Sequence, residues 1–250
     1  MERPIVLTIA GFDPSGGAGL QADIKTFEQH KVYGLSICSA QTVQTENKFL
    51  SINWQEDKYL LEALQVMLTN YKVTVVKLGI IKNIETLLKI VACIHTMEPG
   101  CKIVWDTVIK SSSGFDFWSE DINNNLFFQL LSKIYLITPN YNEVKLLAPF
   151  TDDAKDAAKH LARHCNVLLK GGHNNEEIGV DYLYSNGNVS KLTANGVDIY
   201  EKHGSGCVLS AAITANLALG ADLFTACKQA KTYIERFLLS NKTLLGYHYA

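Results

Sequence analysis

The strongest constraint on the fold of this chain is a regular alternation between short runs rich in apolar and β-branched residues and longer runs with helical spacing. In residues 19–31, for example, Leu20, Ile24 and Phe27 recur at the spacing that places them on one face of a helix. Such an alternation of strands and helices requires a mostly parallel sheet with helices on both faces. The sequence therefore predicts one α/β domain over residues 1–250.

The pattern predicts the individual elements with approximate boundaries. The predicted strands are residues 4–10, 35–38, 73–78, 102–105, 134–137, 167–169, 182–184 and 189–192. The predicted helices are residues 19–31, 57–70, 83–97, 119–132, 152–164, 207–219 and 222–239, with one more after Asn140. The last two strands flank the dipeptide Asn186-Gly187, which is typical of a hairpin turn between antiparallel strands.

The composition excludes several classes of protein. Charged residues make up 19% of the chain, they are interspersed, and the formal net charge is −2, so we expect no nucleic-acid partner. The longest weakly polar stretch, residues 208–221, is too short to span a membrane. Residues 1–10 lack the pattern of a secretory signal, and the six cysteines form no Cys-x-x-Cys pair. We therefore expect a cytoplasmic protein with reduced thiols.

The first candidate binding element is the glycine-rich segment of residues 11–19, which follows the first strand and enters a helix. Glycines at these positions let the backbone approach a ligand and direct free N–H groups towards it. The segment is not a Walker loop, because no Lys-Ser/Thr pair follows its glycines, and no G-x-G-x-x-G register fits it. Pro14 favours a fixed loop shape over a flexible turn.

A second glycine-rich element, residues 203–207, opens an apolar helix near the C-terminus. Unpaired N–H groups and the helix dipole would stabilise an anion here, such as a phosphoryl group during its transfer. The same field would lower the pKa of the Cys207 thiol, so we expect Cys207 to accept a proton. The alternative is a small buried residue that closes a tight turn.

Polar side chains follow several predicted strands, at the edge of the sheet where ligands bind in this class of fold. Asn140 and Glu143 are three residues apart and would share one helix face, where an amide and a carboxylate suit a hydrated Mg²⁺. A capping box at the helix start would explain the same two residues. Asp106 follows another strand, and Lys170, which precedes two glycines, suits a point charge on a phosphate.

Taken together, these motifs resemble the hydroxymethylpyrimidine and phosphomethylpyrimidine kinases of thiamin biosynthesis, in the ribokinase-like superfamily. The resemblance is carried by residues 10–23, 77–80, 106–108, 138–140, 170–173 and 204–207, in the order of the family. It implies a three-layer α/β/α fold with about eight mostly parallel strands. It also implies ATP-dependent, Mg²⁺-requiring phosphorylation of the hydroxymethyl group of 4-amino-5-hydroxymethyl-2-methylpyrimidine, with the monophosphate as an open second substrate, by a homodimer.

The resemblance also implies roles for individual residues. The phosphates and Mg²⁺ would be bound by Asn140, Glu143, Lys170 and Asp106, with Glu143 as the metal ligand. The anion hole would be formed by Gly204, Ser205, Gly206 and Cys207. The pyrimidine would pack against Gly11, Ala18, Ile80 and Val108, beneath a flap at residues 109–114, and pair with Gln44. The last assignment has its own logic, because an amide offers a donor beside an acceptor, which matches the edge of an aminopyrimidine.

Two other functions remain open from the sequence. A pyridoxal or pyridoxine kinase is the nearest, because its substrate is also a flat heteroaromatic ring with a hydroxymethyl group. A Rossmann-type oxidoreductase or a non-catalytic nucleotide-binding module is more distant. The missing G-x-G-x-x-G motif argues against the oxidoreductase, and Cys207 beside a predicted anion site argues against the module.

Overall fold

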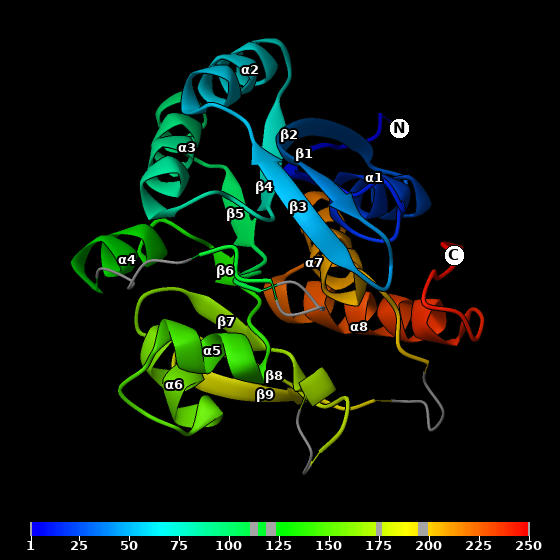
Figure 1. The fold of residues 1–250 in the computed structure, drawn as a ribbon. Helices are drawn as coiled ribbons and strands as arrows, with labels where there is room; N and C mark the ends of the chain where they lie inside the picture. Colours follow the sequence, from blue (N-terminus) through cyan, green and yellow to red (C-terminus); the bar gives the residue numbers. More distant parts are fainter. Residues whose placement is uncertain (1, 111–114, 119–123, 174–176, 195–199, 250) are drawn as a thin grey trace.

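The computed structural model describes residues 2–110, 115–118, 124–173, 177–194 and 200–249. Nine strands form one sheet in the order β3-β2-β1-β4-β5-β6-β7-β8-β9 (Figure 1). The strands are β1 (Ile5–Phe12), β2 (Tyr33–Gln44), β3 (Phe49–Trp54), β4 (Val73–Leu78), β5 (Lys102–Trp105), β6 (Leu136–Ile137), β7 (Asn166–Leu169), β8 (Asp181–Ser185) and β9 (Asn188–Leu192). The helices are α1 (Gly19–Gln29), α2 (Asp57–Asn70), α3 (Ile84–Met97), α4 (Asn124–Leu131), α5 (Tyr141–Leu147), α6 (Ala154–Leu161), α7 (Ser205–Ala218) and α8 (Leu223–Leu239), with a short 3-10 helix at Gly171–His173.

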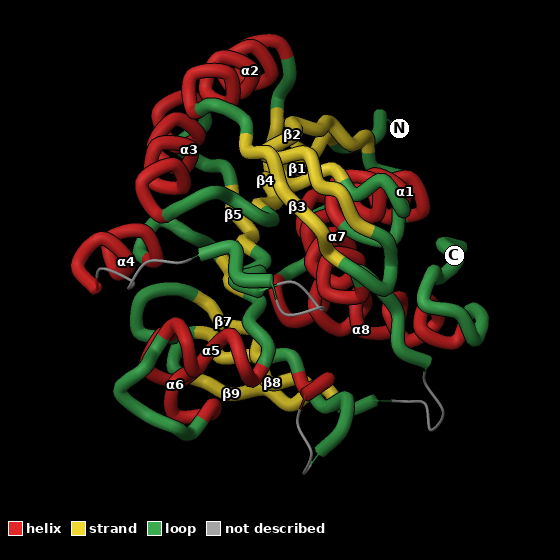
Figure 2. Tube along the Cα trace, in the orientation of Figure 1, coloured by secondary structure: helices red, strands yellow, loops and turns green. Residues whose placement is uncertain are grey.

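Helices cover both faces of the sheet, so the predicted three-layer arrangement is confirmed (Figure 2). One face packs against α2 to α6, and the other packs against α1, α7 and α8. Neighbouring strand residues alternate between these two cores: Ile103 of β5 belongs to the first and Val104 to the second. Burial on both faces explains why the inner strands read as continuous apolar runs. Among the described helices, none has the length and apolarity needed to cross a membrane.

The six inner strands run parallel, and the three others are antiparallel to their neighbours. The hairpin predicted from Asn186-Gly187 is confirmed as β8–β9. The predicted number of strands, about eight, was one too low, because β3 was not recognised. β3 is an edge strand whose residues are half-buried or exposed, and it includes the polar Ser51 and Asn53. Its pairing with Ala40 to Gln44 also extends β2 well beyond the predicted residues 35–38.

Two further predictions fall partly outside the described residues. The helix predicted for residues 119–132 is observed as α4, and residues 119–123 are not described. The predicted flap includes residues 111–114, which are also not described, whereas its first residue, Ile109, is buried. Beyond that segment, Trp118 donates from its indole nitrogen to the Ile81 carbonyl oxygen (2.8 Å), which joins this part of the chain to the end of β4.

A fully buried charge pair joins β4 to α1. Lys77 Nζ lies 2.6 Å from Oδ1 of Asp23, and neither side chain has exposed surface. Thr8 of β1 donates to the other carboxylate oxygen (2.7 Å). Two charges withdrawn from water are tolerated only while each has its partner.

Loss of the Lys77 charge is expected to destabilise the fold strongly, because the Asp23 carboxylate would remain buried and unpaired. We expect Lys77→Met to lower the free energy of unfolding by about 3–5 kcal/mol in urea denaturation. The control is Lys89→Met, which breaks an exposed pair with Asp57 (2.6 Å) and should cost less than about 1 kcal/mol. Equal losses in the two variants would contradict this interpretation of the buried pair.

Candidate functional site

The centre of the candidate site is the carboxylate of Asp106, which follows β5 and is completely buried. Its Oδ1 accepts hydrogen bonds from Thr138 Oγ1 after β6 (3.0 Å) and from Lys170 Nζ after β7 (2.9 Å). Its Oδ2 accepts from Ser210 Oγ of α7 (3.1 Å). Burial alone would raise the pKa of Asp106, but Lys170 and Lys77 outweigh burial and lower it. Asp106 therefore connects the ends of β5, β6 and β7 to α7, and its hydrogen bond orients the Lys170 side chain.

Lys170 reaches from the end of β7 towards the N-terminus of α7. A Cβ atom placed on Gly206 would lie 3.3 Å from Lys170 Nζ, so the ammonium group borders the start of that helix. Glu143 Oε2 lies 3.8 Å from the same nitrogen. Burial would lower the pKa of Lys170, yet the two carboxylates of Asp106 and Glu143 raise it above its ordinary value. The Lys170 side chain is thus a fixed positive charge beside the N-terminus of α7.

Asn140 and Glu143 form a capping box at the start of α5. Asn140 Oδ1 accepts from the backbone N–H groups of Asn142 (2.9 Å) and Glu143 (2.8 Å), and Glu143 Oε2 accepts from the Asn140 N–H (2.8 Å). The capping box is therefore present, and Glu143 within it lies near Lys170. Because these groups follow β6 and β7, which are paired, Asn140 and Lys170 lie beside each other in an isolated bridge.

Glu143 and Thr107 are the groups whose chemistry suits a metal ion. Burial raises the pKa of Glu143 to about 7, against the opposing effects of Lys170 and of the hydrogen bond from the Asn140 N–H. Thr107 Oγ1 is buried and makes no hydrogen bond to any residue that the structure describes. A hard cation with oxygen ligands would satisfy both groups. Within the described ranges, no three His, Cys, Asp or Glu side chains meet as a self-sufficient metal site.

The N-terminus of α7 provides unpaired amides next to these charges. Gly204 is the N-cap residue, has φ 75°, and offers no capping side chain. The first intrahelical acceptor is the Gly204 carbonyl oxygen, bound by the Val208 N–H (3.0 Å), so the N–H groups of Gly206 and Cys207 lack intrahelical acceptors. The Ser205 N–H instead donates to the Lys202 carbonyl oxygen (3.4 Å), so the amides left free at this electropositive helix end are those of Gly206 and Cys207.

The predicted lowering of the Cys207 pKa is wrong. Burial raises the pKa of the thiol to about 11, although Lys77 and the backbone N–H of Gly19 act in the lowering direction. The residue keeps part of its surface exposed, but protein surrounds the sulfur, and Asp106 and Asp23 add negative charge nearby. Desolvation therefore outweighs the Lys77 charge and the Gly19 hydrogen bond. At neutral pH, Cys207 is a neutral thiol.

The two glycine-rich elements are in direct backbone contact. A Cβ atom on Gly204 would lie 2.0 Å from the Gly17 carbonyl oxygen and 2.7 Å from Ala18 Cα, so only glycine fits. Ala18 is also the N-cap of α1, and Gly19 contacts Cys207. The N-termini of α1 and α7 thus open onto the same site.

Among the residues predicted to contact the pyrimidine, Ala18 lies at this junction, and Gly11 and Ile80 contact each other. A Cβ atom on Gly11 would lie 2.4 Å from Ile80 Cδ1, so these two residues are adjacent. Val108 is partly exposed, two residues after Asp106, and its N–H donates to the Asp106 carbonyl oxygen (2.8 Å).

Gln44 belongs to a hydrogen-bonded chain that ends in the first glycine-rich element. Gln44 Nε2 donates to Thr42 Oγ1 (2.9 Å), which donates to the Phe12 carbonyl oxygen (2.9 Å). Phe49 lies directly opposite Gln44 in the β2–β3 pair, so their side chains share one face. The Phe49 ring packs on Phe115, with centroids 4.6 Å apart. A fixed amide beside an aromatic surface suits a flat heteroaromatic ring.

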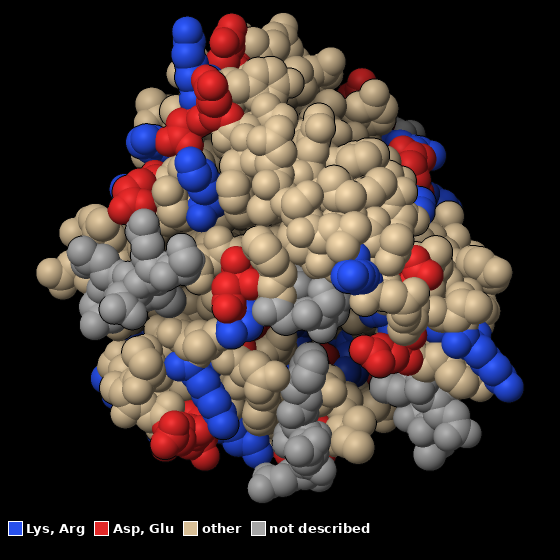
Figure 3. All heavy atoms as spheres, in the orientation of Figure 1, with Lys and Arg blue, Asp and Glu red and all other residues tan. Residues whose placement is uncertain are grey.

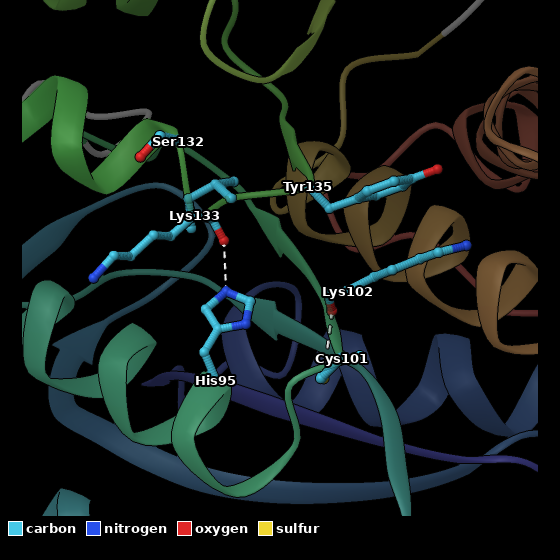
Figure 4. A pocket seen from close by; sticks show the side chains of 8 residues that line it. His95, Cys101, Lys102, Ser132, Lys133 and Tyr135 are labelled. Atoms are coloured by element: carbon cyan, nitrogen blue, oxygen red, sulfur yellow. Dashed lines mark hydrogen bonds between the residues drawn. The ribbon is translucent and has the colours of Figure 1, made fainter.

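The surface hollow drawn in Figure 4 lies at the other end of the sheet, since Lys102 begins β5 and Tyr135 precedes β6. Its polar groups do not converge, because Lys102 extends over the Tyr135 ring while Lys133 points the opposite way. His95 Nε2 is occupied by the carbonyl oxygen of Lys133 (2.8 Å). We therefore assign no function to this hollow.

Four residues of the site were not predicted as such: Asp13, Thr138, His203 and Ser210. Each is a polar residue inside or next to a motif that the sequence had singled out, but its partner lies far away in the chain. Ser210 and Asp106, for example, are 104 positions apart. The available signal for Ser210 was a polar side chain in a mostly apolar helix, a signal that Thr214 and Asn216 share.

Known proteins share both the sequence and the fold. A model of the phosphomethylpyrimidine kinase family matches residues 13–249. The hydroxymethylpyrimidine/phosphomethylpyrimidine kinase of Aquifex aeolicus is 31% identical over 246 residues, which cover 96% of this chain and 96% of the relative.

Two solved structures are similar over nearly the whole chain. The phosphomethylpyrimidine kinase of Clostridium difficile 630 is 32% identical, with a TM-score of 0.78, and the match covers 93% of this chain and 98% of that one. The pyridoxal kinase of Staphylococcus aureus in complex with ADP is 25% identical, with a TM-score of 0.83, and the match covers 95% and 89%. These neighbours confirm the predicted ribokinase-like fold. The chain belongs to the phosphomethylpyrimidine kinase family.

Proposed function

We propose that this protein transfers the γ-phosphoryl group of ATP to the hydroxymethyl oxygen of 4-amino-5-hydroxymethyl-2-methylpyrimidine, and that it also accepts the monophosphate. The observation that carries the proposal is the approach of Lys170 to the amide-rich start of α7 at Gly206. A fixed cation and unpaired amides facing one point suit the charge that develops on a phosphoryl group in transfer. Family membership supports the choice of reaction.

In the proposed mechanism, the protein acts mainly by positioning and by charge stabilisation. The alcohol oxygen bonds to the γ-phosphorus while the bond from phosphorus to the β–γ bridging oxygen breaks. Lys170 and the N–H groups of Gly206 and Cys207 stabilise the transferring group, and Ser205 and Gly204 shape the turn that presents them. Asp106 acts by holding Lys170 in place.

The role proposed for Cys207 follows from its neutral thiol. Since the raised pKa leaves almost no thiolate at neutral pH, Cys207 orients the alcohol by hydrogen bonding, and the proton leaves to an oxygen of the transferred phosphoryl group. Gln44 holds the edge of the ring through its acceptor oxygen and its remaining amide hydrogen. Gly11, Ala18, Ile80 and Val108 contact the ring.

We further propose that Mg²⁺ is bound with the nucleotide. When bound, the ion would neutralise phosphate charge. Glu143 and the Thr107 hydroxyl would hold it, directly or through water, together with phosphate oxygens. Asn140 orients Glu143 through the capping box and presents its amide nitrogen to the phosphates.

We propose a cytoplasmic location and a single domain for residues 1–250. All six cysteines, each within the described residues, are free thiols, which suits a reducing compartment. One continuous sheet joins the first described residues to the C-terminal helices, which supports one folding unit.

We also propose a homodimer formed through the outer face of β2 and β3. Val43 and Leu50 are each 55% exposed, and Phe12 is 40% exposed. The surface over these strands carries few charged side chains (Figure 3). Apolar surface around an edge strand is a favoured place for association.

The proposed reaction predicts ATP consumption with the aminopyrimidine alcohol, at a kcat/KM about 10-fold or more above that for pyridoxal or pyridoxine, because Gln44 matches the aminopyrimidine edge. A coupled assay with each alcohol measures this. Gln44→Leu should lose most of the preference, whereas Gln65→Leu, at an exposed position of α2, should keep it. Preference for pyridoxal would favour the alternative kinase, and no turnover with any of these alcohols would refute the proposal.

The same assay tests the thiol. Cys207→Ala is expected to lower kcat about 10-fold, with little change in the KM for ATP, because an orienting hydrogen bond is lost. A general base would contribute about 10²–10⁴-fold. If Cys207→Ala lost kcat by that larger factor, and if the rate of the wild type increased with pH towards about 11, Cys207 would act as a general base after all.

Glu143 predicts a pH dependence of stability and of Mg²⁺ binding. Because burial raises its pKa to about 7, the stability it contributes in the protonated form is complete below its ordinary pKa of 4.5 and is lost as the pH rises through 7. Glu143→Gln keeps the capping box but cannot ionise. Between pH 5 and pH 8, the free energy of unfolding of the wild type should therefore fall by about 2 kcal/mol relative to that of Glu143→Gln.

In calorimetry, the wild type should bind an Mg²⁺–ATP analogue more tightly at pH 8 than at pH 6, because the ion favours the carboxylate, and Glu143→Gln should lose this dependence. Glu62→Gln, at an exposed position of α2, is the control. Identical pH profiles in the wild type and Glu143→Gln would argue against Glu143 as a ligand of the ion.

The proposed dimer predicts a solution mass of twice 27.7 kDa by light scattering. Leu50→Glu should produce a monomer, because it places a charge in the apolar interface. Phe150→Glu, at a 59% exposed position after α5, should leave the dimer intact. A monomeric wild type would refute the dimer without affecting the proposed reaction.

A further inference from the structure

The two glycine-rich elements are joined by a buried carboxylate–imidazole pair that the proposed mechanism does not use. Asp13 is 1% exposed and His203 is 9% exposed. Oδ2 of Asp13 lies 2.9 Å from Nε2 of His203, across 190 positions of sequence. The pair therefore links the segment proposed to bind the alcohol with the segment that opens α7.

Asp13 organises its own loop. Its Oδ1 accepts from the Ser15 N–H (2.9 Å), and its Oδ2 accepts from Ser15 Oγ (2.8 Å) and from the Ala18 N–H (2.9 Å). Ala18 is one of the residues proposed to contact the ring. Of the interactions made by this carboxylate, the one with His203 crosses to the other element, so a movement of the imidazole is transmitted to Ala18.

His203 is equally fixed on its own side. Its N–H donates to the Leu244 carbonyl oxygen (2.9 Å), and the next residue, Gly204, is the N-cap of α7. A Cβ atom on Gly17 would lie 2.7 Å from Cδ2 of the imidazole ring. The ring thus packs against the loop of Asp13, and the backbone of His203 leads directly into α7.

The chemistry of the pair indicates a directed hydrogen bond. Burial would raise the pKa of Asp13, but the bonds from His203, Ser15 and Ala18 outweigh burial and lower it, so the carboxylate is ionised and only accepts. Nε2 of His203 must therefore donate. Nδ1 is buried and has no partner among the described residues. A buried ring nitrogen without a partner is costly, and an apolar side chain would avoid that cost, so the donation from Nε2 is the interaction that favours a hydrogen-bond donor at this position.

We infer that Asp13 and His203 form a positioning pair, which fixes the distance between the bound alcohol and the amides that receive the phosphoryl group. This inference rests on the proposed function. Transfer between two bound groups is sensitive to displacements of about 1 Å, whereas binding of the nucleotide to Lys170 and α7 does not depend on the alcohol loop. Loss of the pair should thus impair turnover more than nucleotide affinity.

The experiment compares His203→Leu with His203→Gln. The amide nitrogen of glutamine can donate to Asp13 in place of Nε2, and leucine cannot. We expect His203→Leu to lower kcat/KM for the aminopyrimidine alcohol about 10²-fold, while the Kd of an ATP analogue changes less than about 3-fold. His203→Gln should recover most of this loss. Asp13→Asn combined with His203→Leu should be no worse than the more impaired single variant, as for groups that act as a unit.

A second measurement does not depend on catalysis. Hydrogen–deuterium exchange of the peptide covering residues 12–19 should be faster in His203→Leu than in the wild type and unchanged in His203→Gln. If the wild type turns over none of the alcohols, the proposed function fails, and exchange alone still tests the pair. Equal defects in the two variants, a parallel loss of nucleotide affinity, or unchanged exchange in His203→Leu would each overturn the inference.

Discussion

The buried carboxylate of Asp106 is the interaction on which the arrangement of this site depends. It accepts hydrogen bonds from the ends of β6 and β7 and from α7, so it fixes the helix against the carboxyl edge of the sheet. A carboxylate without solvent contact requires such partners, and one of them must be a cation. Lys170 meets this requirement and, through it, is held as a permanent charge at the start of α7. The ion pair that Asp106 needs for its burial is therefore also the one that fixes the position of the Lys170 charge.

The face of the sheet that carries α1, α7 and α8 concentrates the polar groups that would otherwise destabilise a core. Asp23 and Lys77 neutralise each other beneath the site, and Asp13 and His203 join the two glycine-rich elements above it. Both helix N-termini open in the same direction, so their dipoles favour negative charge at one place. A protein with an overall negative charge can therefore be locally electropositive, because the field at this place is set by the nearby fixed groups and not by the net charge.

The raised pKa of Cys207 shows how competing effects are resolved in such a site. Lys77 favours the thiolate, whereas burial and the carboxylates of Asp106 and Asp23 oppose it more strongly. Glu143 illustrates the same balance, because Lys170 is too weakly coupled at 3.8 Å to keep it ionised well below neutrality. Both groups would respond to a bound nucleotide and its cation, since added charge shifts the balance. The protein without ligands therefore holds two groups whose protonation depends on what binds.

The sequence by itself determined the class of fold, the parallel sheet, the hairpin at Asn186-Gly187 and the two glycine-rich elements, because periodicity and glycine placement are local properties. It also located Lys170, Glu143 and the start of α7 at strand or helix ends. It did not reveal β3, whose half-exposed residues become a strand only through pairing with β2. Only the tertiary structure decided the pKa of Cys207, the engagement of Asp106 and the pairing of Asp13 with His203. Burial and partnership between residues more than 60 positions apart determine these properties, and a linear pattern contains neither.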